Sequence, residues 1–153
     1  MNLAYAELAE AFELDAAKAG KQKRYAPAPL QVAAAVMAIR RKKLPDPGEY
    51  ANAGSFFKNP VIDASTAQRL QVRSVTPYRF AQGYKVSAAQ LMDLAGWKGA
   101  RSGDVGCWPK QPLVLVNYGQ ASAEHLLGFA QEIQRSIAER FEIQLELEPS
   151  IVS

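Results

Sequence analysis

The chain has 153 residues, of which 48% are apolar and 22% charged, and its formal net charge is +3. This length predicts one domain with a sizeable core, and the composition is typical of a soluble globular protein. With one cysteine (Cys107) and one histidine (His125), the sequence excludes an intramolecular disulfide framework, favours a reducing, cytoplasmic location and leaves too few soft ligands for a metal site.

The first predicted helix runs from Leu30 to Lys43. Its last turn carries four cations, which complement the helix dipole, and two prolines follow it. The preceding residues 18–29 are typical of a connector. A loop over residues 48–54 then leads to a short apolar piece, residues 55–59. The apolar positions of the helix follow helical spacing: Val32, Val36 and Ile39.

Two short helices are predicted next, over residues 64–71 and 87–95, with Asp63 and Ser87 as their N-caps. The apolar run over residues 113–116 is typical of a buried strand. The clearest helix is capped by Ser122, and its apolar stripe comprises Leu126, Ala130, Ile133, Ile137 and Phe141. The chain closes on a strand in which aliphatic residues alternate with polar ones: Ile143, Leu145 and Leu147. Together these elements predict an α+β domain, with a small mixed sheet packed by helices.

Residues 55–59 form the first candidate site. The small residues before Ser55 allow a sharp turn and the close approach of a ligand. In an extended segment Ser55 and Asn59 would share one face with Phe57, so that a hydroxyl and an amide could meet one substrate. The alternative is the start of a hairpin with two core phenylalanines, Phe56 and Phe57, and the residues by themselves favour it.

Two further positions could carry chemistry. Glu148 lies on the polar face of the closing strand beside Glu146; a solvated edge is the favoured interpretation, and an acid–base carboxylate beside a cavity is the alternative. Lys98 precedes a glycine-rich stretch, residues 99–106, that could hold a phosphate through backbone N–H groups. Neither a P-loop nor a dinucleotide fingerprint occurs in the sequence. Cys107 is expected to be a packed, inert thiol.

Nucleic-acid and membrane partners are not expected. The apolar stretches are too short to span a bilayer, and the acidic N-terminus has no signal-peptide pattern. The basic clusters Lys21–Arg24 and Arg40–Lys43 could face nucleic acid, and a basic nucleic-acid module is kept as a third hypothesis. Because neither cluster has interleaved aromatic residues, solvated charge is the favoured interpretation.

The run LPDPGEYANAGSFFKNP, Leu44 to Pro60, closely resembles the signature of the UDP-N-acetylenolpyruvoylglucosamine reductases. These flavin enzymes make UDP-N-acetylmuramate for bacterial peptidoglycan. The resemblance covers nearly the whole chain but only the C-terminal half of the family's protein. It implies that residues 44–153 form a substrate-binding domain and that residues 1–43 are a remnant of the flavin-binding domain with a connector. Further positions that resemble the family are Tyr5, Tyr78, Lys85, Lys98, Gln111 and Glu148.

The resemblance also implies the chemistry. In the family a reduced flavin delivers hydride to the enolpyruvyl β-carbon, and a serine at the position of Ser55 protonates the α-carbon. Lys43 and Asn59 would stabilise the alkoxide, and the glutamate matched by Glu148 would stabilise the enolic intermediate. The other matched positions imply substrate binding, with Tyr78 and Lys98 directed at the uridine diphosphate: Tyr5, Arg40, Tyr78, Lys98 and Gln111.

One departure from the family leaves two possible alignments of the closing residues with the family's catalytic carboxylate. Leu147 stands where the family usually has proline between two glutamates. Pairing Glu148-Pro149 with the family's Glu-Pro would put Ser150 at the catalytic carboxylate. The ungapped pairing through Glu139-Arg140-Phe141 puts Glu148 there and is preferred. A second departure is Cys107-Trp108-Pro109, which replaces the Val-His of many members.

The resemblance implies FAD and NADPH as cofactors of the complete enzyme, and UDP-N-acetylglucosamine enolpyruvate and the flavin-binding half as partners. That half and its active-site arginine are not among the 153 residues. The chain alone is therefore expected to bind nucleotide sugar weakly, to bind no flavin and to be inactive. The alternative function is a non-catalytic UDP-sugar-binding or partner-binding fragment that complements a separately encoded flavin half.

Overall fold

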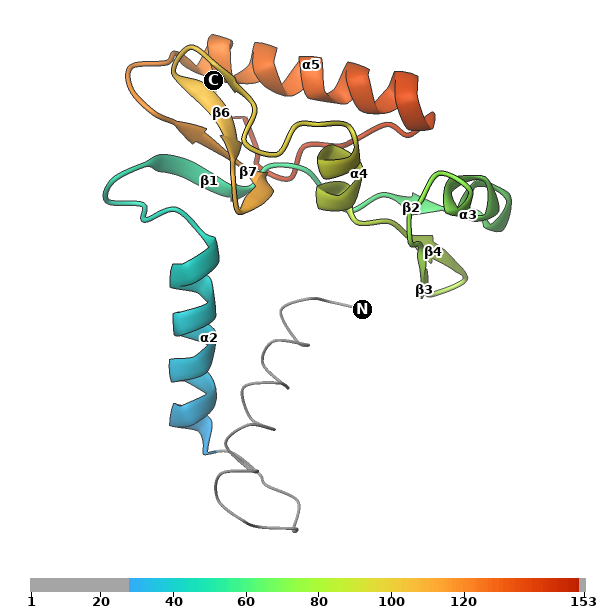
Figure 1. The fold of residues 1–153 in the computed structure, drawn as a ribbon, viewed down its shortest axis with the longest axis horizontal. Helices are drawn as coiled ribbons and strands as arrows, with labels where there is room; N and C mark the ends of the chain where they lie inside the picture. Colours follow the sequence, from blue (N-terminus) through green and yellow to red (C-terminus); the bar gives the residue numbers. More distant parts are fainter. Residues whose placement is uncertain (1–27, 152–153) are drawn as a thin grey trace. The chain divides into compact units, whose positions relative to one another are not determined.

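The computed structural model describes residues 28–151, and the chain divides into two compact units between Leu44 and Pro45. In the first unit the described element is helix α2, Pro29–Lys43 (Figure 1). Proline is favoured in the first turn of a helix, where its missing N–H costs nothing. Leu44 is extended, with φ −100° and ψ 151°, because the ring of the following proline disfavours the helical region for the residue before it.

The second unit contains two antiparallel sheets (Figure 1). The larger has the order β1-β7-β6-β5 and the smaller the order β2-β4-β3. The α+β class is confirmed, although the described strands form two antiparallel sheets where the sequence predicts one small mixed sheet. The strands are β1 (Ala51–Ser55), β2 (Val61–Ile62), β3 (Tyr78–Phe80), β4 (Gly83–Lys85), β5 (Arg101–Ser102), β6 (Val105–Trp108) and β7 (Gln111–Asn117), and the helices are α3 (Ala64–Gln71), α4 (Ala88–Leu94) and α5 (Ala123–Phe141).

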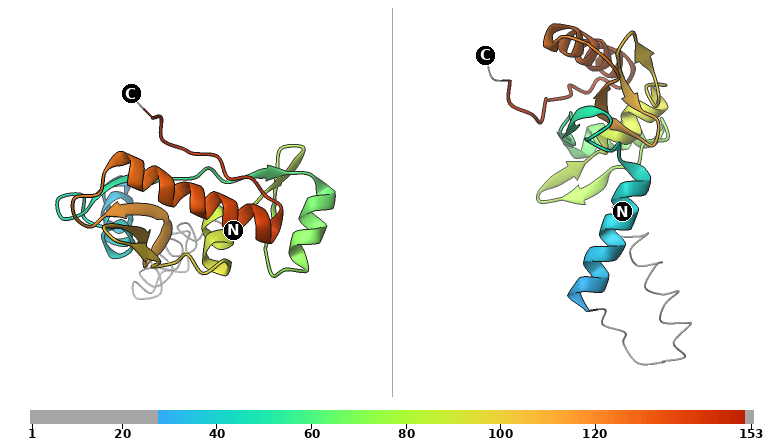
Figure 2. Two further views of the ribbon diagram at one scale, coloured as in Figure 1. Left: turned by 90° about the horizontal axis from the view of Figure 1, so that it is seen from above. Right: turned by 90° about the vertical axis from the view of Figure 1, so that its left-hand side faces the viewer.

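The main core lies between the larger sheet and the helices α4 and α5. Helix α5 contacts β6, and α4 contacts both β7 and α5 (Figures 1 and 2). Ile133 and Ile137 of the predicted α5 stripe are fully buried, in the same core cluster as Leu115 of β7. This burial confirms the helical pattern, and it supplies the stability that an isolated helix lacks in water.

The three predicted N-caps are confirmed. Oδ1 of Asp63 accepts the Thr66 N–H at 2.7 Å, and this hydrogen bond is the main reason that the pKa of Asp63 is lowered. The hydroxyls of Ser87 and Ser122 likewise accept N–H groups from the first turns of α4 and α5. Because a cap depends on neighbours three residues away, it can be predicted from local sequence.

The closing segment, residues 143–148, forms no regular strand, in contrast to the prediction. It makes one antiparallel bridge, Leu147 with Phe57, although its aliphatic side chains do face the core as expected. The ladder stops because the Phe56 N–H donates to Leu113 of β7 instead, and because Pro60 has no N–H to offer.

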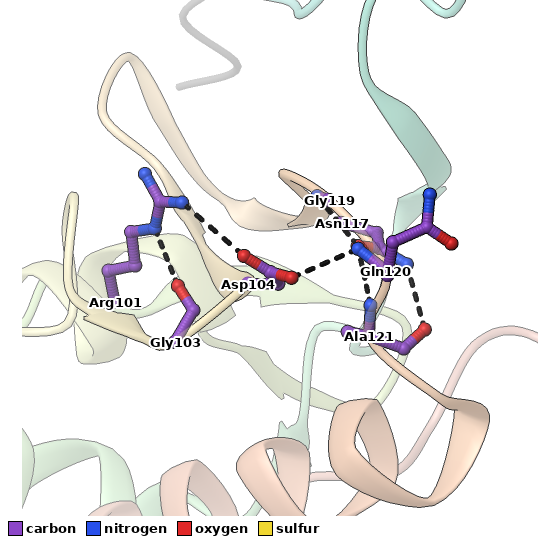
Figure 3. Close-up of polar contacts among 7 residues, drawn as sticks. All are labelled: Arg101, Gly103, Asp104, Asn117, Gly119, Gln120 and Ala121. Atoms are coloured by element: carbon purple, nitrogen blue, oxygen red, sulfur yellow. Dashed lines mark hydrogen bonds and ion pairs between the residues drawn. The ribbon is translucent and has the colours of Figure 1, made fainter.

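A polar network fixes the turn between β7 and α5 (Figure 3). Oδ1 of Asn117 accepts the N–H groups of Gly119 at 3.0 Å and Ala121 at 3.2 Å. Oδ2 of Asp104, from the β5–β6 turn, accepts the Gln120 N–H at 3.0 Å. A Cβ at Gly119 would lie 2.6 Å from that carboxylate, so any larger residue here would displace Asp104 from its contact with Gln120. The network determines where α5 leaves the sheet.

Candidate functional site

A β-bulge determines how Ser55 is presented at the end of β1. Asn52 pairs with Val116 and Ser55 pairs with Val114, so β1 has one extra residue at this point. Gly54 has φ +73°, and its N–H donates to Oδ1 of Asn52 at 3.1 Å. Bulges bend a strand and redirect the side chain that follows, often beside active sites. Here the redirected Ser55 is exposed and lines a pocket.

This pocket has a volume of about 580 Å³ and lies within the second unit. One wall is Ser55 with residues 57–61, which follow the bulge. Lys85 of β4 lines a second side, and the closing segment lines the third. The closing segment contributes three polar side chains: Gln144, Glu146 and Glu148.

The closing segment is hydrogen-bonded to the residues that follow Ser55. The Lys58 N–H donates to the carbonyl of Glu146 at 2.9 Å, and the Glu148 N–H donates to the carbonyl of Phe56 at 3.0 Å. Because Leu147 is paired with Phe57, Glu148 and not Ser150 lies opposite Phe56.

Two lysines of the pocket, Lys58 and Lys85, are not among the site residues predicted from the sequence. Lys58 Nζ lies 3.3 Å from Oε2 of Glu146, and Lys85 Nζ lies 4.3 Å from the centroid of the Phe80 ring. The available signals were the place of Lys58 in the signature run and the resemblance of Lys85 to a family position. With two lysines, two glutamates, a hydroxyl and amides, the lining is suited to a polar ligand that both accepts and donates hydrogen bonds.

Each interpretation of residues 55–59 is confirmed in part, but no hairpin starts here, since β1 pairs with β7 and β2 with β4. Ser55 and Asn59 line the same pocket, as an extended segment would allow. Phe56 and Phe57 are nevertheless both core residues, 4% and 1% exposed, with ring centroids 5.6 Å apart. Oδ1 of Asn59 accepts the Ala88 N–H at 2.9 Å, which ties this wall to the start of α4.

Of the other predicted site residues, the three in the second unit do not line this pocket: Tyr78, Lys98 and Gln111. Tyr5 lies outside the described residues, and Arg40 and Lys43 lie on α2 in the first unit. Tyr78 lies on β3 with 38% of its surface exposed, and Gln111 begins β7. Lys98 follows α4, and its Nζ lies 3.4 Å from Oδ2 of Asp93.

The glycine-rich residues 99–106 lie largely in the β5–β6 hairpin and its approach. Arg101 pairs with Gly106 and Ser102 with Val105, so the segment is folded on itself and is not an open, phosphate-binding loop. The thiol of the next residue, Cys107, is 1% exposed, and burial raises its pKa to about 12. Such a thiol is protonated at neutral pH and therefore a poor nucleophile.

Within residues 28–151 there is no cluster of histidine, cysteine, aspartate and glutamate that could hold a metal ion. No helix in this described part is long and apolar enough to cross a membrane.

The family model of the UDP-N-acetylenolpyruvoylglucosamine reductase C-terminal domain matches residues 46–152, which include the whole pocket. The chain belongs to this family. The resemblance that rests on the run Leu44–Pro60 is thereby confirmed. In this reductase C-terminal domain, the signature run forms the bulge at Ser55 and the wall that follows it.

Curated relatives carry the same name, UDP-N-acetylenolpyruvoylglucosamine reductase. The chain is 50% identical to that of Pseudomonas putida over 120 residues, which are 76% of this chain and 35% of the relative. It is 49% identical to that of Xanthomonas euvesicatoria over 125 residues, 79% of this chain and 36% of the relative. For Ralstonia nicotianae the identity is 46% over 130 residues, 83% of this chain and 38% of the relative. The chain thus spans little more than a third of these reductases.

Proposed function

We propose that this chain is the substrate-binding and proton-donating part of a UDP-N-acetylmuramate dehydrogenase, an oxidoreductase of peptidoglycan synthesis in the cytoplasm. The substrate would be UDP-N-acetylglucosamine enolpyruvate. The observation that carries the proposal is the single pocket that brings together Ser55, Asn59 and Glu148. They are three of the four predicted residues whose chemistry is needed at the reacting end of the substrate, and the fourth, Lys43, lies in the first unit.

Ser55 would donate the proton to the α-carbon of the enolpyruvyl group. An aliphatic hydroxyl is a weak acid, so its alkoxide must be stabilised by cations and hydrogen-bond donors. Lys58 and Lys85 supply ammonium groups in the same pocket. Since Oδ1 of Asn59 already accepts from Ala88, its Nδ2 group is the donor that the amide offers to the pocket.

Glu148 would act as the proton-bearing group beside the enolic intermediate. Its carboxylate lies in the pocket wall, while its main chain is held by Phe56. The remaining predicted residues keep substrate-binding roles in this proposal, on the strength of the family resemblance: Tyr5, Arg40, Lys43, Tyr78, Lys98 and Gln111.

The pocket does not by itself fit a flavin. An isoalloxazine ring needs an apolar slot, whereas this wall is mostly polar and the rings of Phe56 and Phe57 are buried in the core. In the proposal FAD and NADPH therefore belong to the rest of the enzyme, and this chain's residues hold substrate and move a proton.

The proposed division is a substrate-binding domain over residues 44–153, preceded by residues 1–43 from the flavin-binding domain and its connector. The family model supports the substrate-binding domain, since it begins at residue 46. The matches to whole reductases support the assignment of residues 1–43 to the rest of the enzyme. These matches cover up to 83% of this chain and therefore extend upstream of the family model.

The test is co-expression of this chain with the flavin-binding part of the Pseudomonas putida reductase, followed by measurement of NADPH oxidation. Ser55→Ala should abolish reduction of the enolpyruvyl substrate while NADPH still reduces the flavin. Ser102→Ala, an exposed serine on β5, is the matched control and should keep both half-reactions. Equal loss of both half-reactions in Ser55→Ala would indicate a damaged fold. A normal complex with no NADPH oxidation would instead favour the non-catalytic, UDP-sugar-binding alternative.

A further inference from the structure

Glu142 occupies the point where α5 ends and the closing segment begins. Its backbone is left-handed, with φ +58° and ψ 36°, and its N–H donates to the Ala138 carbonyl at 2.9 Å. Its carboxylate lies between two arginines. Oε2 is 3.1 Å from Nη1 of Arg69, and Oε1 is 3.7 Å from Nη2 of Arg73. Arg73 also donates to the carbonyl of Arg140 in the last turn of α5.

This residue is connected to two sides of the pocket. Through its main chain it leads into the closing segment, which carries Glu148. Through its side chain it holds α3, which packs on β4, the strand that carries Lys85. Figure 2 shows α3 beside the C-terminal end of α5, where this ion pair forms.

The backbone conformation of Glu142 indicates that glutamate stands here for the contacts of its side chain and not for the turn alone. The left-handed region is unfavourable for most L residues, and a helix end that needs only the turn is usually Gly or Asn. Glu142 adopts this region while both of its carboxylate oxygens face arginines of the α3 segment. The charged contact therefore explains why glutamate stands here.

We propose that Glu142 is a positioning residue, which keeps Lys85 and Glu148 at a fixed separation and so sets the width of the pocket. As a statement about catalysis this rests on the proposed function, since it assumes that the pocket takes the nucleotide sugar. As a statement about the fold it rests on the Glu142–Arg69 and Glu142–Arg73 contacts alone.

Paired spin labels test how firmly the smaller sheet, which carries Lys85, is held against α5, the helix that leads into the closing segment. Cysteines at Gln82, in the exposed β3–β4 turn, and at Gln131, on the exposed face of α5, would be labelled in the full chain. Cys107 is 1% exposed and does not compete for the label. Glu142→Asn should broaden the distance distribution at least about twofold, because Asn fits the left-handed turn but lacks the charge.

Two matched variants give the controls. Glu142→Asp keeps the charge and tolerates the same backbone, so it should retain most of the narrow distribution. Glu139→Gln removes an exposed carboxylate from the same end of α5 and should leave the width unchanged. Equal widths for Glu142→Asn and Glu139→Gln would overturn the proposal. Should Glu142→Asn fail to fold, Arg69→Gln removes the shorter of the two contacts from the α3 side and must broaden the distribution.

A titration with UDP-N-acetylglucosamine enolpyruvate, whose reacting end would lie in this pocket, connects the width to binding. Glu142→Asn should weaken binding of this substrate about two- to fivefold, the effect of losing an exposed ion pair, and Glu142→Asp should restore it. Unchanged affinity in a variant with a broadened distribution would refute the claim that Glu142 sets the pocket. If the unmodified chain did not bind this substrate, the proposed function would fail, and the spin-label distances would still decide whether Glu142 positions the two sides.

Discussion

The main-chain N–H of Glu148 donates to the carbonyl oxygen of Phe56 at 3.0 Å, which attaches the closing segment beside the residue that follows Ser55. The contact uses main-chain atoms alone, and the Glu148 side chain is exposed in the pocket. Glu148→Gln should therefore change the free energy of unfolding by less than about 0.5 kcal/mol, as measured by urea denaturation.

Leu145, an apolar residue of the same closing segment, should contribute far more to the free energy of unfolding than Glu148 does. Leu145 is 3% exposed in the core, so Leu145→Ala should cost about 2–5 kcal/mol in the same urea experiment. A Glu148→Gln variant that lost as much stability as Leu145→Ala would show that the carboxylate holds the fold, and would count against a chemical role.

The N-cap of α5 should contribute measurably to stability. The Ser122 hydroxyl accepts the His125 N–H at 3.2 Å and satisfies one of the unpaired donors at the start of the helix. Ser122→Ala should lower the free energy of unfolding by about 1 kcal/mol. Ser122→Asp should keep the stability of the parent, because its carboxylate can cap the same turn and complements the helix dipole. Equal loss in both variants would contradict the capping role.

The β3–β4 hairpin holds local backbone strain at Ala81. This residue has φ +48°, a region that disfavours a side chain with a Cβ, and it lies in the two-residue turn between Phe80 and Gly83. Ala81→Gly should therefore stabilise the protein by up to about 1 kcal/mol in urea denaturation. The same replacement at Ala64, in the first turn of α3, should have the opposite sign. A loss of stability at Ala81 would mean that the strain is not relieved.

Cys107 should make the stability depend on alkaline pH. Burial raises the pKa of this thiol from 9.0 to about 12. The unfolded chain releases the proton first, so this contribution to stability is complete below pH 9 and is lost as pH rises towards 12. The loss amounts to at most about 1.4 kcal/mol per pH unit.

The measurement is urea denaturation of the parent and of Cys107→Ala at pH 8 and pH 10.5. Burial also raises the pKa of Tyr118, so the informative quantity is the difference between the two proteins at each pH. That difference should shrink at the higher pH, since the alanine variant has no thiol to ionise. A constant difference would show that the thiol is not desolvated in the folded state.

The parts of the fold that depend on short-range contacts could be predicted. Asp63, Ser87 and Ser122 were recognised as caps because each bonds within its own first helical turn. The stripe of α5 was recognised because apolar spacing follows the helical period. The order of strands could not be predicted, because pairing joins residues far apart in the chain, such as Asn52 with Val116.

The candidate site also has a part that could be predicted from contiguous sequence and a part that could not. The motif around Ser55 was visible because its residues are contiguous, and its small residues and Gly54 point to a turn. Lys85 was missed as a pocket residue because it comes from another sheet, 30 positions along the chain. The prediction of a full closing strand is wrong because the Phe56 N–H donates to the carbonyl of Leu113 on β7, a long-range contact that local sequence does not show.

The sequence by itself determined the family, through one contiguous signature run, and the α+β class, through caps and periodicity that act over a few residues. Only the tertiary structure decided that Ser55, Lys85 and Glu148 line one pocket and that Glu142 connects its sides. The physical reason is that a hydrophobic core and two sheets bring these segments together through long-range packing and pairing. Local propensity carries no information about those contacts.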